Sequence, residues 1–213
     1  MSSIRTIVIC CAGKGTRLGL DKTKALIEIN NKPLIIYHLE KLKEEDDIRI
    51  VVGYQAEELI KVVKEYNPNV KFYYNNDYEI TKSGDSVVCA LKDARKYTLI
   101  LDGDIIIEPN SMKNILNETG EFVCGTKPSS VDGWFEIIEN GNVLGFSRNS
   151  SNVEWNGVTQ IETNKIINSS GHIFQMIEPY LPIKSIQIDT KEIDFMEDYI
   201  KAKEWVDNDY KDL

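Results

Sequence analysis

The chain has 213 residues, of which 42% are hydrophobic and 28% are charged, and its formal net charge is −9 at pH 7. This size and composition predict a single globular domain over residues 1–213, and the acidic balance disfavours long nucleic acid as a partner, because such proteins need a basic surface. No apolar run approaches the roughly 18 residues that cross a bilayer, and the first residues lack the pattern of a signal peptide. We therefore expect a cytoplasmic protein with no membrane span.

Strands and helices alternate in the first half of the chain. β-Branched runs predict strands over residues 4–10, 48–52, 70–74 and 97–101. Amphipathic runs predict helices over residues 31–45, 55–66 and 84–96. Because alternating elements form crossover units between parallel strands, this half predicts an α/β fold with an open, mostly parallel sheet flanked by helices.

The pattern changes after about residue 109. A further strand is predicted over residues 120–126, and residues 134–148 hold two alternating runs that are separated by Asn140 and Gly141. This dipeptide favours a two-residue hairpin turn, so we expect a small β-hairpin lobe in the second half. Residues 162–180 are predicted to be partly helical, and residues 192–206 form an amphipathic terminal helix.

A glycine-rich, basic loop follows the first strand in the stretch VICCAGKGTRLGLDKTKAL, residues 8–26. In an open parallel sheet, ligands bind beyond the carboxyl ends of the strands, and successive backbone N–H groups in such a loop form an anion site. The charges of Arg17 and Lys24 add to that site, which suits a polyphosphate. The spacing is that of neither a Walker loop nor a dinucleotide fingerprint, and a solvated glycine-rich turn is the alternative. The loop residues predicted to bind nucleotide are Ala12, Gly13, Lys14, Gly15 and Thr16.

Six motifs follow one another in an order typical of one enzyme family. They are AGKGTRL, KTKALIEINNKPLI, VVGYQAEEL, GDSVVCAL, LDGD and EIDFMEDY. Together they resemble the nucleotidyltransferases, or pyrophosphorylases, with a nucleotide-diphospho-sugar transferase-like fold. Thr23 stands where the family usually has a proline before the lysine. The ending EIDFMEDY and the GWF triplet are most similar to the CTP-dependent cytidylyltransferases of the phosphocholine and phosphonate type.

The resemblance implies roles for the charged residues. Arg17 and Lys24 would be catalytic, Asp104 and Asp194 would bind Mg²⁺, and Asp102 would support the nucleotide nearby. Carboxylates with phosphate oxygens are the ligands that Mg²⁺ prefers. The alternatives are a plain turn at the Asp-Gly of LDGD and a helix N-cap for Asp194.

Two further groups are predicted to select the substrates. Gly84, Asp85 and Ser86 at a helix start would read a pyrimidine edge, with simple helix capping as the alternative. Trp134 and Trp155 would bind the acceptor, because aromatic faces hold ammonium groups, with core packing as the alternative.

The sequence thus predicts an Mg²⁺-dependent enzyme that transfers CMP from CTP to a phosphorylated small molecule, such as a phospho-amino-alcohol or a phosphonate, and releases pyrophosphate. One alternative is a sugar-1-phosphate nucleotidyltransferase that uses UTP, dTTP or GTP. Another is a catalytically inactive nucleotide-binding regulatory domain. Intact Arg17, Lys24, Asp104 and Asp194 argue against the inactive domain.

Overall fold

The computed structural model describes residues 4–129, 133–149 and 151–210 of the chain. Its largest element is a nine-stranded sheet with the order β5-β4-β1-β6-β11-β8-β12-β10-β9. The strands of this sheet are β1 (Arg5–Cys11), β4 (Ile48–Val52), β5 (Lys71–Tyr74), β6 (Tyr97–Asp102), β8 (Phe122–Thr126), β9 (Trp134–Glu139), β10 (Asn142–Ser147), β11 (Glu154–Glu162) and β12 (Ile183–Gln187). Two short ladders pair β2 (Glu28–Ile29) with β3 (Lys32–Pro33), and β7 (Ile105–Ile107) with β13 (Thr190–Glu192).

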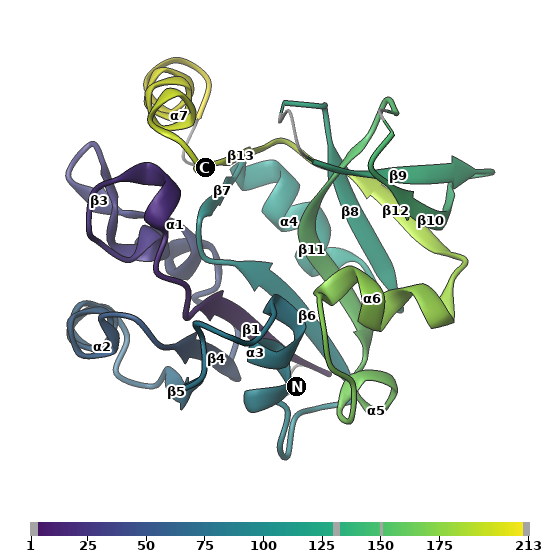
Figure 1. Cartoon of the computed structure of the whole chain (residues 1–213), viewed down its shortest axis with the longest axis horizontal. Coiled ribbons are helices and arrows are strands. Elements are labelled where there is room, and N and C mark those ends of the chain that lie inside the picture. The colour runs from purple at the N-terminus through teal and green to yellow at the C-terminus, as the bar shows by residue number, and fades with distance from the viewer. Residues whose placement is uncertain (1–3, 130–132, 150, 211–213) are drawn as a thin grey trace.

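Helices flank the sheet on both faces (Figure 1). The α-helices are α1 (Leu34–Lys41), α2 (Ala56–Tyr66), α3 (Ser83–Cys89), α4 (Pro109–Asn117), α5 (Thr163–Ile166), α6 (Ile173–Ile177) and α7 (Met196–Asn208). Three short 3₁₀ helices are η1 (Thr16–Leu18), η2 (Lys24–Leu26) and η3 (Glu178–Tyr180). Buried Leu39, Leu59 and Ile115 place α1, α2 and α4 in one hydrophobic core, while Val87 and Ile173 place α3 and α6 in another.

The first half of the sheet is parallel, as the alternation of strands and helices predicts. β5, β4, β1 and β6 pair in parallel, and the β-branched side chains of β1, β4 and β6 are buried because helices cover both faces. The second half is mixed. β11 pairs antiparallel with β6 and with β8, whereas β12 pairs in parallel with β8. The predicted α/β class is therefore confirmed, and the purely parallel pairing is confined to the four strands on one side.

The predicted hairpin is also confirmed. β9 and β10 pair antiparallel across Asn140 and Gly141, whose φ angles of 50° and 77° are those of the turn that matches strand twist. The hairpin belongs to the large sheet, since β10 also pairs with β12 and β9 pairs antiparallel with β11, which closes this half of the sheet on itself.

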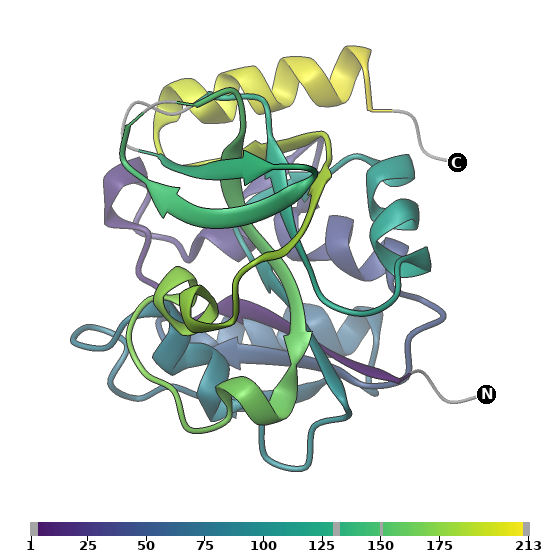
Figure 2. The ribbon, with the colours of Figure 1, turned by 90° about the vertical axis from the view of Figure 1, so that its right-hand side faces the viewer.

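α7 lies across one end of the molecule, above the β9–β10 hairpin in the view of Figure 2. It packs on a third hydrophobic cluster, which includes Leu18, Ile27, Ile106 and Ile193 together with Ala202 of the helix. None of the helices in the described ranges combines the length and the apolar character needed to cross a membrane.

Candidate active site

Strand order brings the glycine-rich loop and the LDGD motif together. β1 and β6 are neighbours in the sheet, with Cys10 in register with Asp102. The chain leaves both strands at the same edge, and the N–H of Gly103 donates a hydrogen bond to the carbonyl of Cys10 at 3.0 Å. The two motifs therefore meet beyond the carboxyl ends of parallel strands, where ligands bind in such sheets.

The glycine-rich loop is shaped around Lys24. Gly15 has a φ of +61°, and a Cβ there would lie only 2.7 Å from the Cγ of Lys24. Glycine is thus required both for the left-handed backbone and for the close approach of the lysine stem. Gly13, Lys14 and Thr16 are exposed. Ala12 is buried, and its carbonyl accepts the N–H of Tyr54 at 3.0 Å.

Lys24 lies between two carboxylates. Its Nζ is 2.7 Å from Asp104 Oδ2 and also pairs with Asp194 Oδ1. Burial by itself would lower the pKa of the Lys24 ammonium, but the two carboxylates outweigh burial and raise that pKa above its ordinary value. Thr23 is compatible with this position, because its N–H donates to Gln55 Oε1 at 2.8 Å, a bond that the proline usual in the family could not make.

Arg17 lies at the exposed side of the same cluster. Its guanidinium is 2.7 Å from Asp194 Oδ1 and 5.5 Å from the centroid of the Phe195 ring. The side chain is 57% exposed, so it has room to move from the carboxylate to an incoming anion. A guanidinium offers a fork of donors that suits phosphate oxygens.

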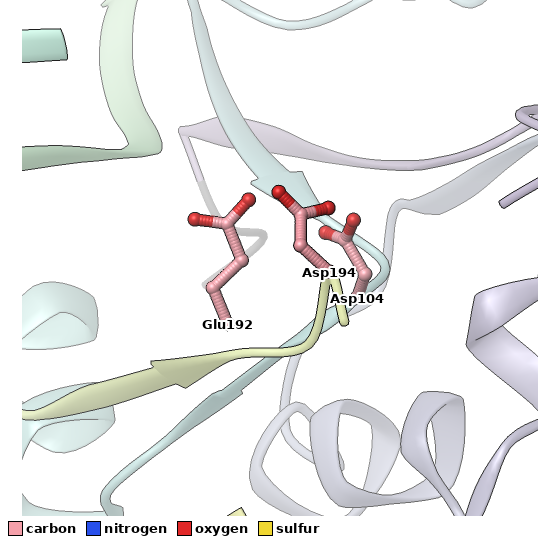
Figure 3. A group of neighbouring side chains, drawn as sticks. All are labelled: Asp104, Glu192 and Asp194. Atoms are coloured by element: carbon pink, nitrogen blue, oxygen red, sulfur yellow. The ribbon is translucent and has the colours of Figure 1, made fainter. Parts of the chain in front are cut away.

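The β7–β13 ladder delivers the last acidic residues. Glu192 is in register with Ile105, and the N–H of Ile193 donates to the carbonyl of Asp104 at 3.0 Å. Asp104, Glu192 and Asp194 consequently point to the same side of the ladder (Figure 3), and one oxygen of each lies within 4.8 Å of the others. Sequence reasoning missed Glu192, although it stands two residues before Asp194 in the same motif.

These three carboxylates fit a divalent metal. They supply hard oxygen donors at close spacing, which suits Mg²⁺ better than a softer metal. The pairing of Lys24 and Arg17 with two of them indicates that the fold concentrates negative charge here and balances it with its own cations.

Asp102 is enclosed by β11. Gly157 of that strand has a φ of +83°, and an added Cβ would overlap the Asp102 carboxylate. Burial, reinforced by the negative charge of Asp104, raises the pKa of Asp102 from 3.8 to about 7. Gly157 lies where the pairing of β11 with β8 shifts register, between Trp155 and Thr159. This irregular stretch lets the backbone pass close to the end of β6.

A cleft of about 520 Å³ opens beside the acidic cluster. Its lining combines residues at the ends of β6 and β13, residues that follow β1, β10 and β13, and residues of β9, β11 and α7. Among the residues that line it are Arg17, Asp102, Trp134, Arg148, Glu154, Trp155, Asn156, Gly157, Glu192 and Asp194. Both predicted tryptophans therefore share a cleft with three of the predicted charged residues. Trp155 also packs against Phe146, with ring centroids 5.3 Å apart.

Gly84, Asp85 and Ser86 have contacts within the protein. The N–H of Gly84 donates to the carbonyl of Gly171 at 2.9 Å, and an added Cβ on Gly84 would be 2.6 Å from that oxygen. Asp85 accepts the N–H of Lys82 at 2.7 Å, which caps α3. Ser86 bonds the amide of Asn75 at 2.9 Å. These contacts within the protein are sufficient to explain why the three residues occur at this helix start. Their contact with a nucleotide base therefore stays a prediction.

The chain matches a known protein family over more than half of its length. The model of the family described as MobA-like NTP transferase domain matches residues 7–132. This stretch contains the glycine-rich loop, Lys24 and the LDGD motif.

Curated relatives and solved structures agree with this match. The bifunctional protein GlmU of Aliarcobacter butzleri is 32% identical over 142 residues, which cover 65% of this chain and 33% of that protein. The chain thus spans about a third of that relative's length. The choline-phosphate cytidylyltransferase of Streptococcus pneumoniae is 32% identical over 135 residues, which cover 61% of this chain and 57% of that protein.

A solved structure extends the likeness to nearly the whole chain. The CTP:phosphocholine cytidylyltransferase of Streptococcus pneumoniae superposes with a TM-score of 0.77 and 25% identity, covering 95% of this chain and 99% of that one. The predicted fold family is therefore confirmed. With the family model, this likeness shows that the chain belongs to the MobA-like NTP transferase domain family and is a nucleotidyltransferase.

Proposed function

We propose that this nucleotidyltransferase uses Mg²⁺ to transfer CMP from CTP to a phosphorylated small molecule. The observation that carries the proposal is the cluster of Lys24, Arg17, Asp104 and Asp194 at the edge of the cleft. Cations and carboxylates alternate there within hydrogen-bonding distance, which is what a site for a metal-bound triphosphate needs.

In the proposed reaction, an oxygen of the acceptor's phosphate or phosphonate attacks the α-phosphorus of CTP. The bond from that phosphorus to the oxygen bridging to the β-phosphate breaks, and pyrophosphate leaves with the bonding electrons. The acceptor oxygen is already an anion, so no side chain has to remove a proton from it. Positioning and charge stabilisation then supply most of the rate enhancement.

Each residue of the cluster has a task in this scheme. Arg17 and Lys24 exchange their carboxylate partners for oxygens of the α-phosphate and of the leaving pyrophosphate. The carboxylates thus released, Asp104 and Asp194, together with Glu192, hold Mg²⁺. Bound there, the metal supplies a Lewis-acid centre that withdraws charge from the phosphates. Backbone N–H groups of Ala12, Gly13, Lys14, Gly15 and Thr16 bind the remaining phosphate oxygens.

CTP is the proposed nucleotide because two kinds of likeness agree. The GWF and EIDFMEDY stretches resemble cytidylyltransferases, and both a curated relative and a solved structure carry a name that specifies cytidylyl transfer to a phosphorylated choline. Gly84, Asp85 and Ser86 are the proposed residues at the pyrimidine edge. Trp155 and the irregular stretch of β11 are proposed to border the acceptor.

Pyrophosphate release tests this proposal. The protein is incubated with Mg²⁺, one of CTP, UTP, dTTP, GTP or ATP, and one of several acceptors that include phosphocholine, phosphoethanolamine, a phosphonate and sugar 1-phosphates. We expect pyrophosphate with CTP and a non-sugar acceptor. Release only with UTP, dTTP or GTP and a sugar 1-phosphate would instead establish the alternative enzyme. Tight nucleotide binding without release in any combination would indicate an inactive domain.

A further inference from the structure

Arg148 lines the same cleft as Asp102, Glu192 and Asp194, although it lies in the hairpin half of the chain. It directly follows β10, and its guanidinium carbon is 4.4 Å from the centroid of the Trp134 ring, at the start of β9. The hairpin turn at Asn140 and Gly141 makes β9 and β10 antiparallel neighbours, so the two ends of the hairpin meet at the cleft.

Trp134 is a support for this arginine. Its ring centroid is 4.1 Å from that of Phe174, with an interplanar angle of 34°. A phenyl ring and a guanidinium at these distances cannot share one face of an indole, so they lie on opposite faces. An acceptor ammonium group therefore has no exposed face of Trp134 to contact while Arg148 is in this position. The indole of Trp134 thus carries a cation of the protein itself, and its predicted contact with the acceptor stays a prediction.

The acceptor needs a cation of its own in the proposed reaction. Its phosphate or phosphonate must come close to a triphosphate and to the acidic cluster, and this accumulation of negative charge is unfavourable without compensation. Arg17 and Lys24 are assigned to the nucleotide. A further cation in the cleft lining, Lys201, pairs with Glu197 at 2.7 Å on the exposed surface of α7. Arg148 lies in the same lining, over the ring of the partly buried Trp134.

We propose that Arg148, positioned by Trp134, binds the phosphate or phosphonate group of the acceptor. A planar guanidinium that stacks on an aromatic face keeps N–H groups at its edge, where they can engage two oxygens of one anion. The anion is common to phospho-amino-alcohols, phosphonates and sugar 1-phosphates, so the assignment does not depend on the organic part of the acceptor. It rests on the proposed function, because it requires an anionic acceptor.

Steady-state kinetics of Arg148→Gln and Arg148→Lys test the assignment. Pyrophosphate release is measured while the acceptor is varied at saturating CTP, and then while CTP is varied at saturating acceptor. We expect the KM for the acceptor to rise about 10- to 100-fold in Arg148→Gln, the effect of losing a charge-assisted contact. The KM for CTP should not change. Arg148→Lys, which keeps the charge without the fork, should fall between Arg148→Gln and the wild type.

Two controls separate binding from structure. Lys96→Gln removes another cation held over an aromatic ring, 4.9 Å from the centroid of Tyr97 and remote from the cleft motifs, and should leave both KM values unchanged. Mg²⁺ with CTP should raise the thermal midpoint of Arg148→Gln as much as that of the wild type, which shows an intact nucleotide site.

An unchanged acceptor KM in Arg148→Gln, or an equal rise in both KM values, would overturn the assignment and leave Arg148 as a packing partner of Trp134. This outcome is distinct from failure of the proposed function, in which the wild-type protein itself releases no pyrophosphate with any anionic acceptor. That second result would overturn both proposals.

Discussion

At the scale of single residues, Asp194 and Asp198 have different contacts at the start of α7. The Asp194 carboxylate pairs with Lys24 and Arg17, whereas the Asp198 carboxylate accepts the N–H of Phe195 at 2.8 Å and the N–H of Asp194 at 3.2 Å. The sequence left open whether Asp194 caps the helix. Asp198 does so, and the side chain of Asp194 is therefore available to the cleft.

Gly157→Ala should reduce turnover, whereas a glycine substitution away from the cleft should not. The new Cβ would overlap the Asp102 carboxylate, so the end of β6 would have to move within the site. Gly120→Ala is a matched control, because Gly120 has a similar φ of +75° and its added Cβ would have no neighbour within 4 Å. Gly120→Ala should lose about 1–2 kcal/mol of unfolding free energy through backbone strain, measured by urea denaturation, and Gly157→Ala should lose at least as much because of the added overlap with Asp102. Only Gly157→Ala should lose pyrophosphate release, by about tenfold or more. Equal activity in the two variants would show that Asp102 needs no fixed position.

Glu136 makes the stability of the hairpin region depend on pH. Its side chain is 1% exposed, and the Ser185 hydroxyl donates to its Oε2 at 2.6 Å. Burial raises the pKa of Glu136 from 4.5 to about 7, and the Ser185 hydrogen bond only partly opposes this rise. The folded state thus favours the protonated carboxyl, so this residue contributes stability below pH 4.5 that is lost as the pH rises through about 7.

The variant Glu136→Gln checks this dependence. The wild-type contribution that disappears amounts to at most about 3 kcal/mol, and the neutral amide should not lose it. We expect urea denaturation to show that Glu136→Gln gains stability relative to the wild type between pH 5 and pH 8. Parallel stability curves for the two proteins over this range would mean that Glu136 is ionised in the folded protein at the lower pH as well.

At the scale of elements, the short β7–β13 ladder determines the composition of the acidic cluster. The residues of β13 lie about 85 positions after their partners in β7 along the sequence, and the hydrogen bond from the N–H of Ile193 to the carbonyl of Asp104 fixes the register of the two strands. A strand of three residues has too little alternation to be recognised, and its partner is remote in sequence. This is the reason that Glu192 could not be placed beside Asp104 from the sequence.

From the contacts of the acidic cluster we expect the affinity for Mg²⁺ to depend on bound nucleotide. Without nucleotide, the Lys24 ammonium and the Arg17 guanidinium neutralise Asp104 and Asp194 and repel another cation. In the proposed reaction, a triphosphate draws both cations away and thereby frees the carboxylates. Calorimetric titration with Mg²⁺ should give weak binding to the protein alone and much tighter binding with a non-hydrolysable CTP analogue present.

Lys24→Gln supplies the control for this coupling. Removing the lysine charge should tighten Mg²⁺ binding in the absence of nucleotide by about tenfold, equivalent to about 1.4 kcal/mol. The coupling to the nucleotide should weaken in the same variant. Identical Mg²⁺ affinities with and without the CTP analogue in the wild-type protein would contradict the proposed exchange of partners.

Some strands and helices could be predicted from the sequence, and others could not. The parallel strands and the hairpin were predictable, because β-branched runs, amphipathic helices and the Asn-Gly dipeptide are local signals. β11 was not predicted, although it is the strand that joins the two halves of the sheet. Its buried residues include Glu154, Asn156, Thr159 and Gln160, and its register shifts near Gly157, so it shows neither an apolar run nor strict alternation. The predicted helix over residues 84–96 ends at Cys89, because the segment after α3 turns towards β6.

The residues of the site also fall into those that the sequence could place and those that it could not. Arg17, Lys24, Asp104 and Asp194 meet as the motif order implies, since each follows a strand or a strand ladder at one edge of the sheet. The position of Arg148 over Trp134 could not be read from the sequence, because it depends on which faces of the indole the core already covers.

At the scale of the whole molecule, the cleft lies where two kinds of sheet meet. The parallel strands β1 and β6 lead into the glycine-rich loop and the LDGD motif, and the antiparallel strand β11 brings Trp155 and Gly157 to the same place. The strand order β5-β4-β1-β6 changes direction between β1 and β6, and ligands bind beyond the carboxyl ends of parallel strands at such a point. One sheet runs through both halves, which supports the single-domain organisation proposed for residues 1–213. The proposed nucleotide and acceptor sites then belong to one framework.

The central claim is nucleotidyl transfer at the acidic cluster, and phosphorus NMR of a complete reaction tests it most directly. The wild-type protein is mixed with CTP, phosphocholine or another active acceptor, and Mg²⁺, and parallel samples contain a chelator or the Asp104→Ala variant. We predict that the CTP resonances disappear as pyrophosphate and a new diphosphate diester appear in equal amounts. Neither product should form with the chelator or with Asp104→Ala. Formation of CDP and inorganic phosphate, or an undiminished rate in Asp104→Ala, would contradict the claim.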